Sequence, residues 1–299
     1  MLKEIHRPTR VPAKLFELIL SADYKSKSKN NEKEPNYTMP TYCIEIPHVV
    51  LTPTRLFLQG FSVEISNRIT RQFDNIKFVR LGIADEDMTN MFSDNFSDEI
   101  CERIKGIILN GITLNDCHFR FLAYSSSQLK EKSMWMVSCS SRKKDYIRSW
   151  MGDFNNIKLP SKYAARMGQC FSTTIQTLSG NSHTRESSMN NGNTSNHLRV
   201  CDDYDDIGVG DFCHSDGTGL ICQYRLKEAL TCMPFAPTDL NDVSIVQIRF
   251  GGAKGTLTSW DFEKIQGLKN RQSADVYLRP SMVKFKAPYH NLEIISIGR

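Results

Sequence analysis

Near its C-terminal end the chain sets single cations among apolar, strand-like residues. The first such segment, Val243 to Leu257, reads VSIVQIRFGGAKGTL. Apolar residues alternate with Arg249 and its polar neighbours, so a strand would point Arg249 away from one apolar face. Gly251 and Gly252 follow, which let a backbone bend sharply or approach a ligand closely, and Lys254 comes just after them. Cations placed in this way could neutralise the charge of a negatively charged partner.

The second segment, VYLRPSMVKFK from Val276 to Lys286, has a similar pattern. Arg279 precedes Pro280, which donates no hydrogen bond to a sheet ladder, and Lys284 lies four positions later among apolar residues. Solvated charges on edge strands are the alternative interpretation, and for any one lysine this is the more common case. The recurrence of cations beside glycine bends favours a shared role.

The composition permits a polyanionic partner without requiring one. The chain has 299 residues, a formal net charge of +5, 40% hydrophobic residues and 24% charged residues. This is a globular composition with room for one large or two smaller domains. From Arg249 to the C-terminus, nine Lys or Arg residues stand against four Asp or Glu residues. The basic excess therefore lies where the four candidate cations lie.

Local patterns also predict elements elsewhere in the chain. Ser97 is a good N-cap, and isoleucines at helical spacing run from Ile100 to Ile108 before Gly111, which predicts a core-packing helix. A polar, low-complexity tract over 179–197 predicts a surface loop. The expected organisation is an N-terminal segment with a polar linker over 1–40, a mixed α/β region over 41–200 and a C-terminal domain over 201–299.

Two further basic stretches each allow two interpretations. In SNRITRQF, helical spacing would place Arg68 and Arg71 on neighbouring positions of one helix face. The stretch from Arg142 to Arg148 combines four cations with Tyr146, which is the composition of a segment that faces nucleic acid. A solvated helix face is the alternative for both stretches.

Ordered blocks of sequence carry a family resemblance. QIRFGGAKG and LRPSMVKF resemble the paired barrel motifs of the cellular RNA-dependent RNA polymerases that make double-stranded RNA in RNA silencing. The blocks upstream that keep to the family's order are LTPTRLFLQG with SNRITRQF, FRFLAYSSSQLKEKSMWM, WMGDF, KYAARMGQCFSTT and HSDGTGLI. Together they run from about Thr41 to the C-terminus, and an ordered set is far more specific than any one block.

The resemblance implies a fold and roles for the cations. The expected fold class is α+β, with a mixed helical and strand slab followed over 201–299 by the first of the two double-psi β-barrels of the family core. In that fold the first barrel supplies basic side chains that face the second barrel's aspartates. The residues expected to support catalysis as cations, and to bind RNA or nucleotide phosphate together with Arg279, are Lys254, Arg249 and Lys284.

The resemblance also implies a cofactor and partners. Template-directed nucleotide addition needs a two-metal site made of clustered carboxylates. In the family a DxDGD triad downstream of LRPSMVKF holds these ions, so Mg²⁺ is expected on a triad that this chain does not contain, with no metal ligand inside the chain. The expected partners are an RNA template, nucleoside triphosphates, a C-terminal catalytic segment missing here and silencing-pathway proteins.

One acidic string imitates the triad. DDYDDIGVGD, from Asp202 to Asp211, lacks a glycine between its second and third carboxylates and precedes HSDGTG, whereas the family's triad lies downstream of the barrel motifs. We interpret it as an acidic linker.

Two classes of function remain open at this point. One is an RNA-directed RNA polymerase whose activity depends on a downstream segment, and the other is a truncated, inactive RNA-binding or assembly module. The nine cysteines are scattered without a CxxC pair, and no apolar run reaches the roughly eighteen residues of a membrane span. An intracellular protein is expected, cytoplasmic or nuclear, without membrane insertion.

Overall fold

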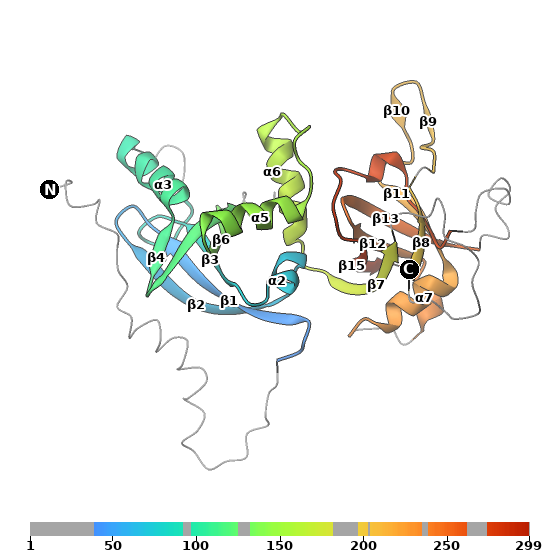
Figure 1. Cartoon of the computed structure of the whole chain (residues 1–299), viewed down its shortest axis with the longest axis horizontal. Coiled ribbons are helices and arrows are strands. Elements are labelled where there is room, and N and C mark those ends of the chain that lie inside the picture. The colour runs from blue at the N-terminus through green and yellow to red at the C-terminus, as the bar shows by residue number, and fades with distance from the viewer. Residues whose placement is uncertain are drawn as a thin grey trace, which may run out of the picture. The chain divides into compact units, whose positions relative to one another are not determined.

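The computed structural model describes residues 39–91, 97–124, 132–181, 197–202, 204–234, 239–261 and 274–298. The chain divides into two compact units (Figure 1). One unit contains the residues up to Ser149 together with Lys158–Phe171, and the other contains Trp150–Ile157 together with the residues from Ser172 onward. Most of the predicted N-terminal segment over 1–40, and residues 182–196 of the predicted loop, lie outside the described residues.

The first unit is built on a six-stranded mixed sheet. Its strand order is β2-β1-β3-β6-β5-β4, in which β1 and β3 are parallel and the other neighbours are antiparallel. The strands are β1 Cys43–Leu51, β2 Leu56–Ile65, β3 Lys77–Ile83, β4 Ile112–Leu114, β5 Cys117–Ala123 and β6 Ser133–Ser138. The central strands supply the buried core of this unit, including Val79, Leu81 and Met136.

Helix α3, Asp98–Asn110, confirms the predicted core helix. The Ser97 hydroxyl accepts a hydrogen bond from the backbone N–H of Ile100, and the chain leaves the helix at Gly111 with a φ of 82°. Ile104, Ile107 and Ile108 pack against the sheet core. The spacing of the isoleucines therefore marks the face that packs against the sheet.

The short helix α2, Arg68–Gln72, begins with a capping box. The Asn67 side chain accepts hydrogen bonds from the backbone N–H groups of Ile69 and Thr70, and the Thr70 hydroxyl accepts one from the Asn67 N–H. Arg68 is only 5% exposed, and Arg71 Nη1 donates to the Ser66 carbonyl at 3.0 Å. The interpretation as a solvated helix face is thus wrong for Arg68, because the capped turn presses it into the unit.

The remaining helices of this part of the chain are α5 Ser141–Met151, α6 Pro160–Gly168 and the 3-10 turn η2 Gln169–Phe171. Pro160 lies at the start of α6, where the missing backbone N–H costs nothing. No described helix has both the length and the apolar composition needed to cross a membrane.

The second unit is a closed β-barrel with the strand order β11-β13-β12-β15-β7-β8-β14. Three pairings are parallel, namely β11 with β13, β7 with β8 and β8 with β14. The strands are β7 Ile175–Asn181, β8 His197–Cys201, β11 Thr218–Cys222, β12 Ile245–Phe250, β13 Ala253–Trp260, β14 Val276–Tyr277 and β15 Asn291–Gly298. In Figure 1 these strands are coloured from yellow-green to dark red.

Alternation along β12 supplies the barrel core. Val246, Ile248 and Phe250 are each 5% exposed or less, and they pack with Leu257 of β13 and Leu292 of β15. Helix α7, Gln223–Thr231, adds Leu226, Ala229 and Leu230 to the same cluster. The mixed α/β composition and the presence of a barrel are confirmed, whereas the double-psi connectivity stays a prediction.

The barrel begins earlier in the chain than the boundary predicted at residue 201. Strand β7 pairs antiparallel with β15, and strand β8 pairs with both β7 and β14. Ile175 and Leu178 of β7 are buried. A polar tract separates these strands in the sequence, but both strands close the barrel and belong to the unit that contains the residues from Ser172 onward.

Three short elements complete the described part of the barrel unit. The small hairpin consists of β9 Gly208–Val209 and β10 Phe212–Cys213, and the two 3-10 turns are η3 Leu240–Asp242 and η5 Pro280–Met282. Val209 and Phe212 are 74% and 76% exposed, so the hairpin tip carries apolar side chains at the surface.

Candidate functional site

The β12–β13 hairpin brings Arg249 and Lys254 together. They are directly opposed across the two strands, and Arg249 is opposed on its other side by Glu293 of β15. Directly opposed residues of antiparallel strands project from the same face, with Cβ atoms about 4.5–5.5 Å apart. Ile248 and Phe250 fill the core, so Arg249 projects from the opposite face, as its alternation predicts. Both cations are half-buried.

The glycines of this hairpin accommodate backbone from other parts of the barrel. Gly251 has a φ of 53°, and the tight two-residue turns of β-hairpins require such a positive φ at their first central residue. A Cβ added at Gly252 would lie 1.7 Å from the Phe285 carbonyl oxygen, and one at Gly255 would lie 2.1 Å from the Gly217 carbonyl oxygen. The close approach that the glycine pattern predicts is thus one between backbone segments of the same barrel, and not one of the backbone to a ligand.

Lys284 lies on the segment that passes beside Gly252. Its backbone N–H donates to the Gly252 carbonyl at 3.1 Å, and the preceding Val283 forms an antiparallel bridge with Ala253. Its Nζ donates to the Ser281 carbonyl and lies 3.6 Å from Asp216 Oδ1. Three of the four predicted cations therefore come from residues that surround the Gly251–Gly252 turn.

Arg279 has a different environment. It is 6% exposed, its Nη1 donates to the Asp205 carbonyl, and its guanidinium lies 4.2 Å from the centroid of the Tyr204 ring. Both contacts hold residues 204–205 against the barrel. The geometry assigns Arg279 to that packing, and its predicted contact with phosphate stays a prediction.

The acidic string is more than a linker, because Asp206 is bound to the barrel. Asp206 Oδ2 accepts from the Ser281 N–H at 2.9 Å, and Oδ1 accepts from the Ser281 hydroxyl at 2.6 Å and the Ser215 hydroxyl at 3.1 Å. The Ser281 hydroxyl is the main reason why the pKa of Asp206 lies below its usual value. Sequence spacing gave no sign of this contact, which joins residues 75 positions apart.

Comparison with known proteins identifies the family. A family model described as RNA dependent RNA polymerase matches residues 51–299. The chain belongs to this family. The match confirms the resemblance that the sequence blocks indicate.

Individual relatives agree with this assignment. RNA-dependent RNA polymerase 1 of Arabidopsis thaliana is 31% identical over 277 residues, which cover 88% of this chain and 22% of that relative. RNA-dependent RNA polymerase 1 of Schizosaccharomyces pombe is 34% identical over 266 residues, which cover 86% of this chain and 20% of that relative. The chain thus spans about a fifth of the length of these curated relatives.

A solved structure shows the same fold. RNA dependent RNA polymerase QDE-1 from Thielavia terrestris superposes with a TM-score of 0.62 at 14% identity, and the match covers 100% of this chain and 31% of that chain. At this identity the likeness concerns the fold of the RNA-dependent RNA polymerase chain, not its residue roles.

The described residues of this chain do not form the metal site of a two-metal reaction. In the part of the chain that the structure describes, no group of three His, Cys, Asp or Glu side chains is placed to hold a metal ion. Within the acidic string, both oxygens of Asp206 accept hydrogen bonds from Ser281 or Ser215. No step of metal-assisted chemistry is therefore assigned to these residues.

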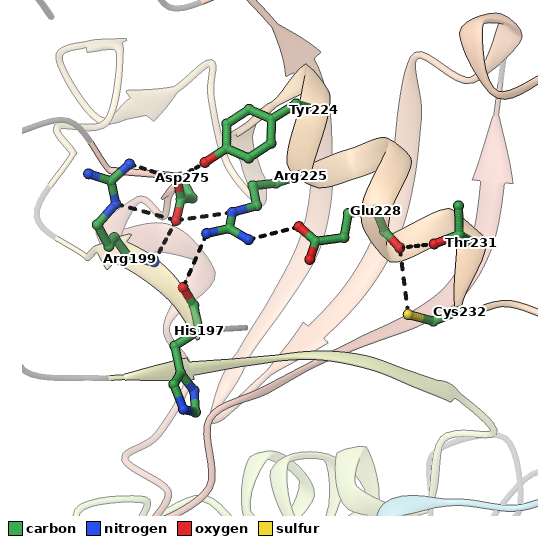
Figure 2. Close-up of polar contacts among 8 residues, drawn as sticks. All are labelled: His197, Arg199, Tyr224, Arg225, Glu228, Thr231, Cys232 and Asp275. Atoms are coloured by element: carbon green, nitrogen blue, oxygen red, sulfur yellow. Dashed lines mark hydrogen bonds and ion pairs between the residues drawn. The ribbon is translucent and has the colours of Figure 1, made fainter. Parts of the chain in front are cut away.

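Sequence reasoning missed a buried ionic cluster around Asp275 (Figure 2). The Asp275 carboxylate is 1% exposed and lies 3.0 Å from Arg199 Nη2 and 3.4 Å from Arg225 Nε, and the Tyr224 hydroxyl donates to it at 2.8 Å. Figure 2 shows the two arginines on opposite sides of the carboxylate. Burial alone would raise the pKa of Asp275, but the hydrogen bonds from Arg199 and Tyr224 outweigh it, so the pKa lies below its usual value.

This cluster ties together three segments of the barrel unit. Arg199 belongs to β8, Arg225 belongs to α7 and Asp275 directly precedes β14. Arg225 also pairs with Glu228, one helical turn along α7, at 2.8 Å. The sequence does signal that i,i+3 pair, but the partner 50 residues away in the chain has no local signature.

The basic stretch of α5 is only partly available to a ligand. Arg148 donates from Nε and Nη2 to the Leu122 carbonyl, and from Nη2 to the Phe121 carbonyl as well, which ties the helix to β5. Lys143 Nζ lies 4.8 Å from the centroid of the Tyr146 ring, and the Tyr146 side chain is half exposed. One of the four cations of this stretch therefore serves the fold.

Proposed function

We propose that this chain forms part of an RNA-directed RNA polymerase that makes double-stranded RNA in RNA silencing. In this proposal the closed barrel is the first of the family's two double-psi β-barrels. Arg249, Lys254 and Lys284 neutralise the phosphate charge of RNA or of an incoming nucleoside triphosphate. The observation that carries the proposal is the convergence of these three residues on the Gly251–Gly252 turn.

The way in which the cations are held supports this role. Arg249 and Lys254 are fixed by their strand register, and Lys284 is fixed by its backbone bond to Gly252. A cation that is already in place need not be ordered when negative charge develops, and this preorganisation is the main source of electrostatic catalysis. Half-burial strengthens the effect, because a charge near a low-dielectric wall acts more strongly than one in water.

The chemistry of nucleotide addition requires carboxylates that the described residues do not provide. Mg²⁺ would supply activation of the attacking hydroxyl and stabilisation of the leaving pyrophosphate. Under the proposal, aspartates on a segment beyond this chain hold the ions, and the present residues contribute charge neutralisation and positioning.

RNA binding tests the part of the proposal that concerns this chain. Single-stranded RNA of mixed sequence should bind the 299-residue chain weakly, with an affinity that falls as salt rises from low to moderate concentration. The combined variant Arg249→Ala, Lys254→Ala and Lys284→Ala should lose most of this binding and most of its salt dependence. A matched control removes three positive charges from the first unit through Lys105→Ala, Lys158→Ala and Lys162→Ala. If the two triple variants lost RNA affinity equally, the effect would come from net charge alone, and the proposal would be overturned.

A non-catalytic RNA-binding or assembly module is the second candidate. It is favoured by the sequence itself, which contains no DxDGD string, and by the bound state of Asp206. Purified chain should incorporate no labelled nucleotide in the presence of Mg²⁺ under either candidate, so incorporation by this chain would contradict both. Joining the chain to a segment with the aspartate triad separates them, because activity restored in that way supports the polymerase.

A further inference from the structure

Ser281 links the Asp206 carboxylate to Lys284. Its N–H and hydroxyl both donate to Asp206, at 2.9 Å and 2.6 Å, and its hydroxyl also accepts from the Gly217 N–H at 3.3 Å. Its carbonyl accepts from Lys284 Nζ. The position of the lysine ammonium therefore depends on a turn whose backbone and side chain are both bound by Asp206.

Asp206 is itself held firmly. Its Oδ1 also accepts from the Ser215 hydroxyl at 3.1 Å, and that same hydroxyl accepts from the Ile207 N–H at 2.7 Å. The chain around the carboxylate is thus closed into a small ring of hydrogen bonds. A carboxylate with several donors in fixed positions is a strong anchor, since charge-assisted hydrogen bonds are roughly twice as strong as neutral ones.

Asp216 contacts the same lysine in a different way. Its Oδ1 lies 3.6 Å from Lys284 Nζ, which is beyond ordinary hydrogen-bond length, and its side chain is 66% exposed while that of Lys284 is 20% exposed. A long ion pair whose carboxylate is mostly exposed contributes little and exchanges readily. Asp216 therefore occupies a position that a phosphate oxygen could take.

We propose that Asp206 is a positioning residue that holds the Lys284 ammonium in place through Ser281, and that Asp216 is an exchangeable counterion that an RNA phosphate displaces. This inference rests on the proposed function, because it takes Lys284 as a phosphate contact. It adds two opposite roles for carboxylates that stand ten residues apart in one acidic segment.

The two roles predict opposite effects for the same chemical change. Asp206→Asn and Asp216→Asn each remove one negative charge, so bulk electrostatics would make both variants bind RNA more tightly. Under the proposal Asp206→Asn weakens binding of a labelled single-stranded RNA by about 2- to 5-fold, and Asp216→Asn strengthens it by about 2- to 5-fold. Asp211→Asn, an exposed carboxylate of the same hairpin region, measures the bulk effect and should change affinity by less than about 2-fold.

A double-mutant cycle separates positioning from general damage to the barrel. Affinity falls as salt rises, so the slope of log affinity against log salt is negative. Lys284→Ala should make this slope shallower by about 0.7, the value for one phosphate contact on a single strand. Asp206→Asn should also make the slope shallower in an otherwise wild-type chain. In the Lys284→Ala background Asp206→Asn should have no further effect on the slope. Ser281→Ala, which keeps the backbone N–H, should fall between wild type and Asp206→Asn. Full additivity of Asp206→Asn and Lys284→Ala would overturn the proposal.

A readout without RNA keeps this inference distinct from the proposed function. Acylation of lysines by an amine-reactive ester, followed by mass spectrometry, reports how firmly Lys284 is held, with the exposed Lys286 as internal reference. Asp206→Asn should raise the relative rate at Lys284 with an unchanged thermal midpoint. An unchanged rate overturns the positioning role whatever the RNA result. If Asp206→Asn raises the acylation rate at Lys284 but Lys284→Ala leaves RNA affinity unchanged, the positioning role stands. The proposed function of Lys284 as a phosphate contact is then rejected.

Discussion

The barrel gathers its charges in two places that are built by different means. At the Gly251–Gly252 turn, backbone groups approach one another closely and bring three cations around one hairpin. Around Asp275, side chains make the contacts, and two arginines and a tyrosine share one buried carboxylate. Under the proposed function, the cations that are arranged by backbone contacts bind phosphate, whereas the arginines around the buried carboxylate hold elements of the barrel together.

Gly252→Ala should break the first region, with the largest expected effect. The added methyl would lie 1.7 Å from the Phe285 carbonyl oxygen, and only a shift of backbone can relieve that overlap. We expect a loss of unfolding free energy above about 4 kcal/mol, or no folded protein at all. Gly106→Ala in α3 is the control, because a Cβ there meets nothing within 4 Å. Chemical unfolding of both variants checks the expectation, and two equally mild variants would contradict the close approach.

Asp275→Ala should break the second region with a slightly smaller effect. It removes the carboxylate that the largely buried Arg225 shares with the half-exposed Arg199, and the loss of hydrogen bonds between charged groups typically costs about 1.5–3 kcal/mol. Thermal and urea unfolding measure the loss. RNA binding by the fraction that stays folded should be nearly normal, since the cluster contains none of the three proposed phosphate contacts. A variant that is stable but deficient in RNA binding would reverse the assignment of the two regions.

Lys254→Ala should separate activity from stability. In a longer form of the protein with an intact aspartate triad, loss of this preorganised cation should lower single-nucleotide incorporation by roughly 100- to 1000-fold. Stability should fall by no more than about 1 kcal/mol, because a half-exposed lysine contributes little to folding. Arg249→Ala is the companion variant. Near-normal turnover in both variants would contradict the assignment of these cations to phosphate contacts. A large fall in the thermal midpoint would instead indicate a structural role.

Acid should weaken the Asp275 cluster, with the smallest effect of the four. The folded pKa of Asp275 lies below its usual value, so its ionised form contributes stability at pH values above about 3.9. That contribution is lost as the pH falls through the lower, folded pKa. The stability difference between wild type and Asp275→Asn should therefore stay nearly constant above about pH 5 and shrink as the pH falls below about 4. Urea unfolding at several pH values measures it, and a constant difference would mean that the charge of Asp275 does not matter.

Local patterns predicted the elements that carry the site. The alternation of Val246, Ile248 and Phe250 has the period of a strand, so the buried face of β12 and the outward direction of Arg249 could be deduced without a structure. Ser97 and Gly111 mark the ends of α3 for a similarly local reason, namely hydrogen bonding at a helix start and a backbone angle at its end. The family resemblance predicted the barrel itself.

Contacts between distant residues could not be predicted in this way. Arg279 and Asp206 were interpreted from neighbours in the chain, but their partners lie more than seventy positions away. Asp275 has no charged neighbour within three residues on either side, so nothing local indicates its burial between two arginines. The start of the barrel was placed too late for the same reason, since β7 is recognised as a barrel strand only through its pairing with β15.

That pairing has a consequence for how the protein is made. Strand β15 lies between β7 and β12 in the barrel, and the Thr177 hydroxyl donates to the Leu292 carbonyl across 115 positions of sequence. Contacts between such distant residues form slowly, because a long loop must close before they can stabilise anything. At ribosomal speeds of roughly 5–20 residues per second, β7 would wait on the order of 10 s for its partner to be synthesised. During that interval the nascent chain presents an unpaired edge of β7 to the cell, and later one of β12, so this is when we expect chaperones to matter most for it.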